Sequence, residues 1–178
     1  CLAFSCSNNN KKNSQHFCKE LMLNCNLNNN KLLFHTSKGT FEVKLFANSH
    51  PLTSANFISN VNKKLYDKSH FYKILNYQNT KIIYGGINSN EDLNGINEGS
   101  FYSNNKIPLE IKLINNKIIY GIPIYDPPDI KKLKYKFEKG SLAMVKINNE
   151  NSSSTEFFIT LNDLPEFNGR YSVFGRVI

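Results

Sequence analysis

Apolar and polar residues alternate over residues 40–46, which read TFEVKLF. A period of two is typical of a strand with one buried face. Residues 31–36 are also strand-like, and residues 37–39 (SKG) join the two segments. The sequence therefore predicts an antiparallel hairpin over residues 31–46.

From residue 51 the apolar spacing changes to a period near 3.6, which is typical of a helix packed on one face. Pro51 suits the first turn of such a helix, because its missing N–H and fixed φ cost nothing there. The apolar stripe consists of Leu52, Ala55, Phe57, Ile58 and Val61.

Short apolar segments separated by turn signals fill the C-terminal end of the chain. Residues 141–145 and 156–160 are strand-like, the second aromatic and β-branched. Asn168-Gly169 is a tight-turn signal, and residues 171–178 form a closing strand. Many short strands and one clear helix predict a β-barrel or a sandwich.

The longest irregular segment covers residues 115–138. Tyr125-Asp126-Pro127-Pro128 interrupts regular structure, and the lysine-rich residues 131–139 are interpreted as a solvated face. Docking of this basic run to an acidic partner is the alternative.

Length and charge set broad limits. The 178 residues suit one domain, 40% of them are hydrophobic, and the net charge is +8. A basic chain can bind nucleic acid or anionic lipid, but such binding needs a clustered patch. The lysines are scattered, so we expect no nucleic-acid partner.

All four cysteines lie before residue 26, at positions 1, 6, 18 and 25. Their spacing fits neither C-x-x-C nor a usual zinc pattern, and the histidines form no cluster, so we expect no metal or other cofactor. A disulfide between Cys18 and Cys25 is one interpretation. Free or modified thiols are the interpretation that the sequence favours.

The first residues suggest a secretion signal. Residues 2–6, LAFSC, resemble the cleavage box of a bacterial lipoprotein, in which the cysteine is lipidated. We therefore expect residues 1–30 to be a signal remnant and flexible linker, and residues 31–178 to be the domain. Lipidated Cys6 would tether an extracytoplasmic protein to a membrane. The alternative is a disordered N-terminus on a cytoplasmic protein.

Several motifs occur together and in order within residues 31–178. They are Pro51, Thr53, Asn56 and Phe57; residues 71–74, FYKI; Gly85-Gly86; Gly140, Leu142, Ala143 and Met144; residues 155–159, TEFFI; and residues 168–177, NGRYSVFGRV. This arrangement resembles the cyclophilin family of peptidyl-prolyl cis-trans isomerases. The resemblance implies a monomeric, closed eight-stranded antiparallel β-barrel capped by two helices, the second near residues 161–165.

Isomerising an X-Pro bond means crossing a barrier of about 18–20 kcal/mol that amide resonance sets. The reaction needs no nucleophile, metal or proton transfer. A catalyst can hold the proline ring in an apolar pocket and aim a donor at the prolyl nitrogen, which becomes a better acceptor as the amide twists. The resemblance places Lys73 where the family has its catalytic arginine.

The resemblance also implies a substrate-binding set. An apolar pocket would come from Phe158, Phe167, Tyr171, Met144 and, more loosely, Ile82. Met144 has a second interpretation as a core residue.

Glu156 and Tyr84 stand where the family usually has glutamine. An ion pair between Lys73 and Glu156 would occupy the donor and weaken catalysis.

Two functions follow from this comparison. The first is a peptidyl-prolyl isomerase that assists folding, acts on proline-containing peptides or unfolded proteins, and is slowed by the changes at Lys73 and Glu156. The second is a non-catalytic module that binds proline-containing peptides.

Overall fold

The computed structural model describes residues 9–28, 30–87, 107–147 and 151–178. The helices are α1 (Asn9–Glu20), α2 (Pro51–Asn62), α3 (Pro127–Ile130) and the 3-10 turn η1 (Pro165–Phe167). The strands are β1 (Lys31–Thr36), β2 (Gly39–Leu45), β3 (His70–Tyr77), β4 (Thr80–Gly86), β5 (Glu110–Lys112), β6 (Ile118–Tyr120), β7 (Ser141–Ile147), β8 (Asn151–Thr160) and β9 (Val173–Val177).

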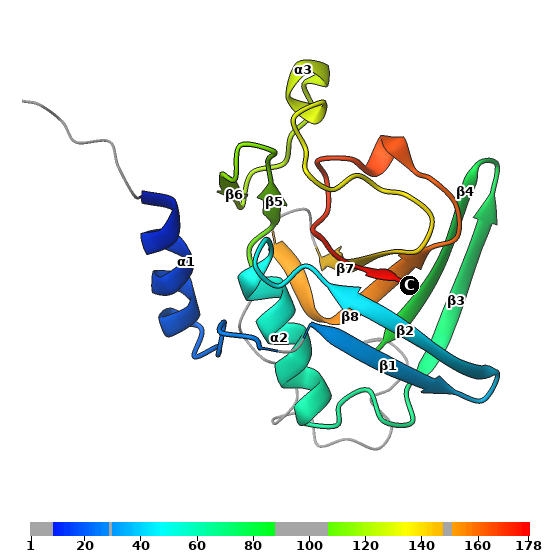
Figure 1. Ribbon diagram of the computed structural model, residues 1–178. Helices are drawn as coiled ribbons and strands as arrows, with labels where there is room; N and C mark the ends of the chain where they lie inside the picture. The colour runs from blue at the N-terminus through cyan, green and yellow to red at the C-terminus, as the bar shows by residue number, and fades with distance from the viewer. Residues whose placement is uncertain (1–8, 29, 88–106, 148–150) are drawn as a thin grey trace, which may run out of the picture.

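Seven strands form one curled antiparallel sheet in the order β1-β2-β9-β7-β8-β4-β3, and β5 pairs with β6 (Figure 1). The expected closed eight-stranded barrel therefore differs from the structure, because β1 and β3 are not paired within the described residues. Side chains approach across this open side, where the rings of Phe41 and Phe71 lie 6.5 Å apart.

The predicted elements fall largely into place. The hairpin of β1 and β2 and helix α2 are confirmed. The second expected helix is only the single 3-10 turn η1, a few residues beyond the predicted position.

The sheet has two packed faces. Directly paired residues alternate between them, so Leu142 and Ile159 face one side, while Ala143 and Phe158 face the other. The first face carries the larger hydrophobic core, which α2 covers with the fully buried Phe57. The second face carries a separate cluster of aromatic residues.

A distant carboxylate caps the N-terminus of α2. Oε2 of Glu110, on β5, accepts hydrogen bonds from the backbone N–H (2.8 Å) and the hydroxyl (2.6 Å) of Thr53. Its Oε1 accepts a hydrogen bond from the backbone N–H of Leu52 at 3.1 Å. These bonds satisfy N–H groups that a helix leaves free at its start. Glu110 therefore fixes α2, and with it the cover of the first face.

Helix α1 lies in the segment that we interpreted as a linker with a short helix around residues 17–23, and it begins earlier than that. A disulfide joins Cys18, in the last turns of α1, to Cys25 after the helix, so the less favoured interpretation of these cysteines describes the structure. The hydroxyls of Ser14 and Tyr120 lie 2.5 Å apart, joining α1 to β6. Cys6 lies outside the described residues, so its lipidation stays a prediction. No described helix is long and apolar enough to cross a membrane.

Candidate functional site

A row of directly paired residues crosses four strands on the second face. Lys73 on β3 pairs with Tyr84 on β4, Tyr84 with Phe158 on β8, and Phe158 with Ala143 on β7. Such cross-strand partners share a face and touch. The Lys73 ammonium lies 5.6 Å from the centroid of the Tyr84 ring, and the rings of Tyr84 and Phe158 lie 5.8 Å apart. The row brings the expected donor and the expected pocket together.

A bulge in β3 gives Lys73 this position. The register shifts between His70 and Lys73, so β3 has one more residue than β4 over this stretch. Phe71 packs into the core of the first face, whereas the rings of Tyr72 and Tyr84 lie 6.3 Å apart. Bulges re-aim side chains in this way, and the one here turns both Tyr72 and Lys73 toward the second face.

Aromatic rings surround Phe158. Its centroid lies 5.4 Å from that of Tyr171 and 6.2 Å from that of Phe167, both at edge-to-face angles. Phe158 is only 2% exposed, and Ile82 is fully buried in the same cluster. Phe167, Tyr171 and Tyr84 are partly exposed. The cluster is thus an apolar floor at Phe158 with a rim of three rings.

The sequence interpretation missed one member of this cluster, Phe137. Its ring stacks on Phe158 at 5.9 Å with an interplanar angle of 6°. Phe137 is buried although it lies in the basic run interpreted as a solvated face, so that interpretation is wrong here. The segment Lys134-Tyr135-Lys136-Phe137 alternates exposed lysines with packed rings, and this period of two was the available signal.

The 115–138 segment also forms hydrogen bonds to the loop of residues 167–171, which carries the rings of Phe167 and Tyr171. The backbone N–H of Phe137 donates to Oδ1 of Asn168 at 2.8 Å, and the N–H of Ile124 donates to the carbonyl of Gly169 at 2.9 Å. Gly169 has φ +76°, and a Cβ there would collide with the Ile124 carbonyl. The segment therefore positions the turn between Phe167 and Tyr171.

Glu156 lies beside this cluster but does not pair with Lys73. Its Oε1 accepts a hydrogen bond from the Tyr72 hydroxyl at 2.9 Å, and burial raises the pKa of the carboxyl. Among the described residues, no ion pair involves Lys73. The ion pair considered from the sequence is absent from this structure, which leaves the Lys73 ammonium over the Tyr84 ring.

Met144 lies on the opposite side of the sheet. It is 1% exposed and packs in the core of the first face, opposite Phe157 on β8. The structure therefore separates Met144 from the rings around Phe158, in line with its interpretation as a core residue.

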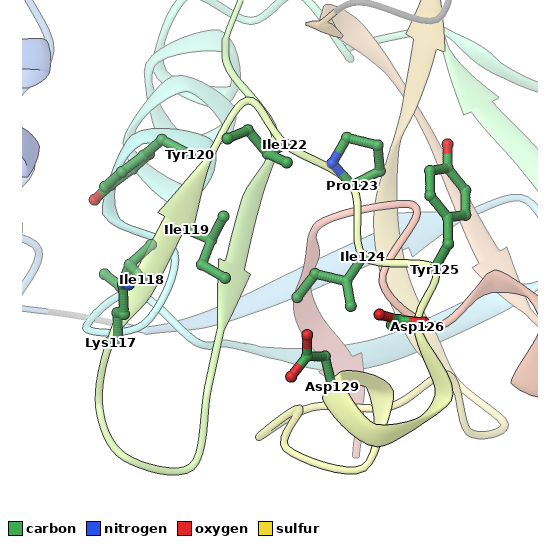
Figure 2. A pocket seen from close by; sticks show the side chains of 10 residues that line it. All are labelled: Lys117, Ile118, Ile119, Tyr120, Ile122, Pro123, Ile124, Tyr125, Asp126 and Asp129. Atoms are coloured by element: carbon green, nitrogen blue, oxygen red, sulfur yellow. The ribbon is translucent and has the colours of Figure 1, made fainter.

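A separate hollow lies away from these residues, between the β5–β6 hairpin and α3 (Figure 2). Its volume is about 700 Å³. Ile118 and Ile124 line it, together with the carboxylates of Asp126 and Asp129, the second of which binds Lys132 at 2.7 Å. Within the described residues, no group of His, Cys, Asp or Glu could hold a metal ion.

Comparison with known proteins identifies the family and the fold. The family model described as cyclophilin type peptidyl-prolyl cis-trans isomerase/CLD matches residues 31–178. The chain belongs to this family. Among solved structures, a cyclophilin-type isomerase from Cryptosporidium parvum is 24% identical, with a TM-score of 0.52 over 84% of this chain and 77% of its own. A cyclophilin from Hirschia baltica gives a TM-score of 0.57 at 17% identity over 83% of this chain and 63% of its own. These two likenesses support the cyclophilin fold.

The curated relatives differ in how much of their own length this chain matches. The peptidyl-prolyl isomerase cwc-27 of Neurospora crassa is 29% identical over 154 residues, which are 82% of this chain but 27% of the relative. The chain therefore spans about a quarter of that relative. A peptidyl-prolyl cis-trans isomerase of Acinetobacter baylyi is 25% identical over 85% of this chain and 68% of its own length.

Proposed function

We propose that this cyclophilin isomerises peptidyl-prolyl bonds, at a rate reduced by the residues at positions 73 and 156. The observation that carries the proposal is the paired row of Lys73, Tyr84 and Phe158, with the rings of Phe167 and Tyr171 around Phe158. Partial exposure of Tyr84 and Tyr171 in the rim allows contact with a proline ring.

The chemistry asks little of the protein. The rings hold the proline, and Lys73 donates to the prolyl nitrogen as the amide twists, so the donor stabilises the transition state more than the ground state. Lys73 has no acidic partner among the described residues and is free to do this. An ammonium is a point donor without the planar fork of arginine, which is why we expect a reduced rate.

The substrates in this proposal are proline-containing peptides and unfolded proteins. A structure of the Cryptosporidium parvum isomerase in the presence of the dipeptide Ala-Pro supports this class of ligand. No metal or organic cofactor takes part.

Exchange spectroscopy by NMR on an X-Pro peptide tests the proposal. The protein should accelerate cis-trans exchange above background. Lys73→Met should abolish the acceleration, and Lys73→Arg should raise it about three- to ten-fold, because arginine restores the forked donor. Lys38→Met, in the exposed β1–β2 turn, is the matched control. No acceleration at high protein concentration would rule out the isomerase, and an unchanged rate in Lys73→Arg would remove Lys73 from its role.

Two observations favour a second candidate, a peptide-binding module without catalysis. Phe158 is nearly covered, and Glu156 brings a carboxylate to the edge of the site. Peptide binding without any rate enhancement would select this candidate. Turnover gained by Glu156→Gln would show that the carboxylate is what blocks the chemistry.

We further propose that the protein is extracytoplasmic and tethered through lipidated Cys6. The Cys18–Cys25 disulfide supports an oxidising compartment, where such bonds persist. Mass spectrometry of the native protein would exclude the tether by finding unmodified Cys6 with residues 1–5 still attached.

A further inference from the structure

Lys146 lies at the opposite side of the ring cluster from Lys73. Its ammonium is 5.4 Å from the centroid of the Tyr171 ring, and the Tyr171 ring is 5.4 Å from that of Phe158. Lys73 stands in the same relation to Tyr84, the ring next to Phe158 on the other side. Each ammonium is thus one ring away from the floor of the pocket.

An irregularity in the pairing of β7 with β8 precedes Lys146. Ala143 packs on the second face and Met144 on the first, so strict alternation would return Lys146 to the buried core with Met144. Val145 packs on the second face, as alternation predicts. Between Met144 and Lys146 the register shifts, because β8 runs from Phe157 to Ser152 while β7 advances only from Met144 to Lys146. Beyond this interruption strict alternation no longer holds, and the Lys146 ammonium lies over the Tyr171 ring instead of in the core.

The described surroundings of Lys146 leave its charge uncompensated. In the part of the chain that the structure describes, no carboxylate lies within ion-pair distance of it. The side chain is partly buried, and this burial lowers the pKa of the ammonium. A cation that has lost some water and lies over a ring gains more from an incoming anion than a fully solvated one.

We propose that Lys146 is a specificity-determining residue that selects peptides with an anionic side chain close to the proline. This inference rests on the proposed peptide site, which it deepens by naming the substrate class. With a proline seated near Phe158, an extended peptide advances about 3.3–3.6 Å per residue. Side chains within about three residues of the proline therefore come within reach of the flexible lysine. In the same complex Lys73 donates to the prolyl nitrogen, so Lys146 is the lysine that binds an anionic side chain of the peptide.

The anion can be a carboxylate or a phosphate, and matched peptides separate the two. One series carries Glu or Gln at single positions one to three residues from an Ala-Pro pair, on either side. A second series carries phosphoserine or serine at the same positions. Both dissociation constants, from NMR titration, and kcat/KM, from exchange spectroscopy, are measured at about 20 mM and 500 mM salt.

At low salt we expect the best-placed Glu peptide to bind and turn over about three- to five-fold better than its Gln partner, the size that a partly exposed ion pair allows. The preference should fade at high salt, where screening is strong. A larger preference for phosphoserine over serine would identify phosphate as the favoured anion. A preference confined to the Glu series would identify carboxylate.

Three variants tie the preference to one side chain. Lys146→Met should bring the Glu-to-Gln ratio to about one, Lys146→Glu should invert it, and Lys146→Arg should keep it. Lys38→Met should leave the ratio at its wild-type value. Equal binding and turnover of Glu and Gln peptides at every position would overturn the inference while leaving the isomerase intact. Selective binding of the Glu peptide without turnover would support the inference and remove the isomerase.

Discussion

Phe157 and Phe158 are neighbours on β8, yet they belong to opposite faces of the sheet. Both are almost completely buried, at 3% and 2% exposure. The rings around Phe157 are Phe34, Phe57, Tyr66 and Phe71. The rings around Phe158 are Tyr84, Phe137, Phe167 and Tyr171.

The two clusters differ at their edges rather than at their centres. Helix α2 covers the first, while the second ends in partly exposed tyrosines with Lys73, Lys146 and Glu156 beside them. Burial of the central ring therefore does not separate a core from a binding site. What distinguishes the binding site from the core is its charged and partly exposed rim.

Replacement of the two phenylalanines should have the largest effect and should separate the faces. Phe157→Ala should lower the free energy of unfolding by about 3–5 kcal/mol, because it empties a well-enclosed space in the larger core. Phe158→Ala should cost about 2–3 kcal/mol, because the rim rings can move inward, but it should also abolish peptide binding. Urea unfolding and peptide titration measure the two quantities. Equal unfolding costs together with unchanged peptide affinity in Phe158→Ala would remove the distinction between the faces.

The next largest effect should be on the pH dependence of stability, through Glu110 and His50, the two buried titratable groups at the start of α2. Burial raises the pKa of Glu110 to about 7, although its hydrogen bonds to Thr53 and Leu52 act in the opposite direction. Its contribution to stability is therefore present below about pH 4.5 and is lost as pH rises through 7. Burial, with Lys112 nearby, lowers the pKa of His50 to about 3, so its contribution is lost as pH falls from about 6.5 toward 3.

These opposite slopes should nearly cancel between about pH 4.5 and 6.5 in the wild type, each being about 1.4 kcal/mol per pH unit at most. Glu110→Gln should leave unfolding free energy that rises with pH across this window, and His50→Gln should leave one that falls. Urea unfolding at pH 4.5, 5.5 and 6.5 gives the slopes. If the free energy of unfolding varied with pH in the same way in both variants, Glu110 and His50 would not control the pH dependence of stability.

The sequence was sufficient for the elements whose signals are local. Alternation over residues 40–46 and the 3.6-residue period after Pro51 correctly predicted β2 and α2. The family motifs brought Lys73, Tyr84 and Phe158 into the same site, and the structure pairs them directly.

What the sequence could not supply depends on contacts between distant residues. A β-bulge before Lys73 turns that lysine to the second face, and the register of β7 against β8 shifts before Lys146, so strict alternation predicts the wrong face for both lysines. The cap on α2 joins Glu110 to Leu52 and Thr53, which precede it by 58 and 57 positions in the sequence. No local pattern reveals contacts between residues so far apart. Phe137 was hidden because the lysines around it dominated the interpretation of its segment.

Asn168 should show that the second face depends on the 115–138 segment. Asn168→Ala leaves the buried N–H of Phe137 without its acceptor, so unfolding free energy should fall by about 1–3 kcal/mol, with faster hydrogen exchange at Phe137. Asn168→Asp keeps an acceptor and should cost less. Exchange by NMR and urea unfolding are the measurements. Unchanged exchange at Phe137 in Asn168→Ala would mean that this bond does not hold the segment to the loop.

Phe167 offers the smallest and most specific change, because it belongs to the rim alone. Its ring stands edge-on to Phe158 at 6.2 Å and helps to cover the floor of the pocket. Phe167→Leu removes the ring, exposes more of Phe158, and should improve the affinity for an Ala-Pro peptide by about two- to five-fold, with less than about 1.5 kcal/mol lost from stability. Leu164→Val, a buried change of similar kind in the same cluster, is the control and should leave affinity unchanged. Weaker binding by Phe167→Leu would show that the peptide contacts the Phe167 ring itself. The peptide would then bind to the rim without needing access to Phe158.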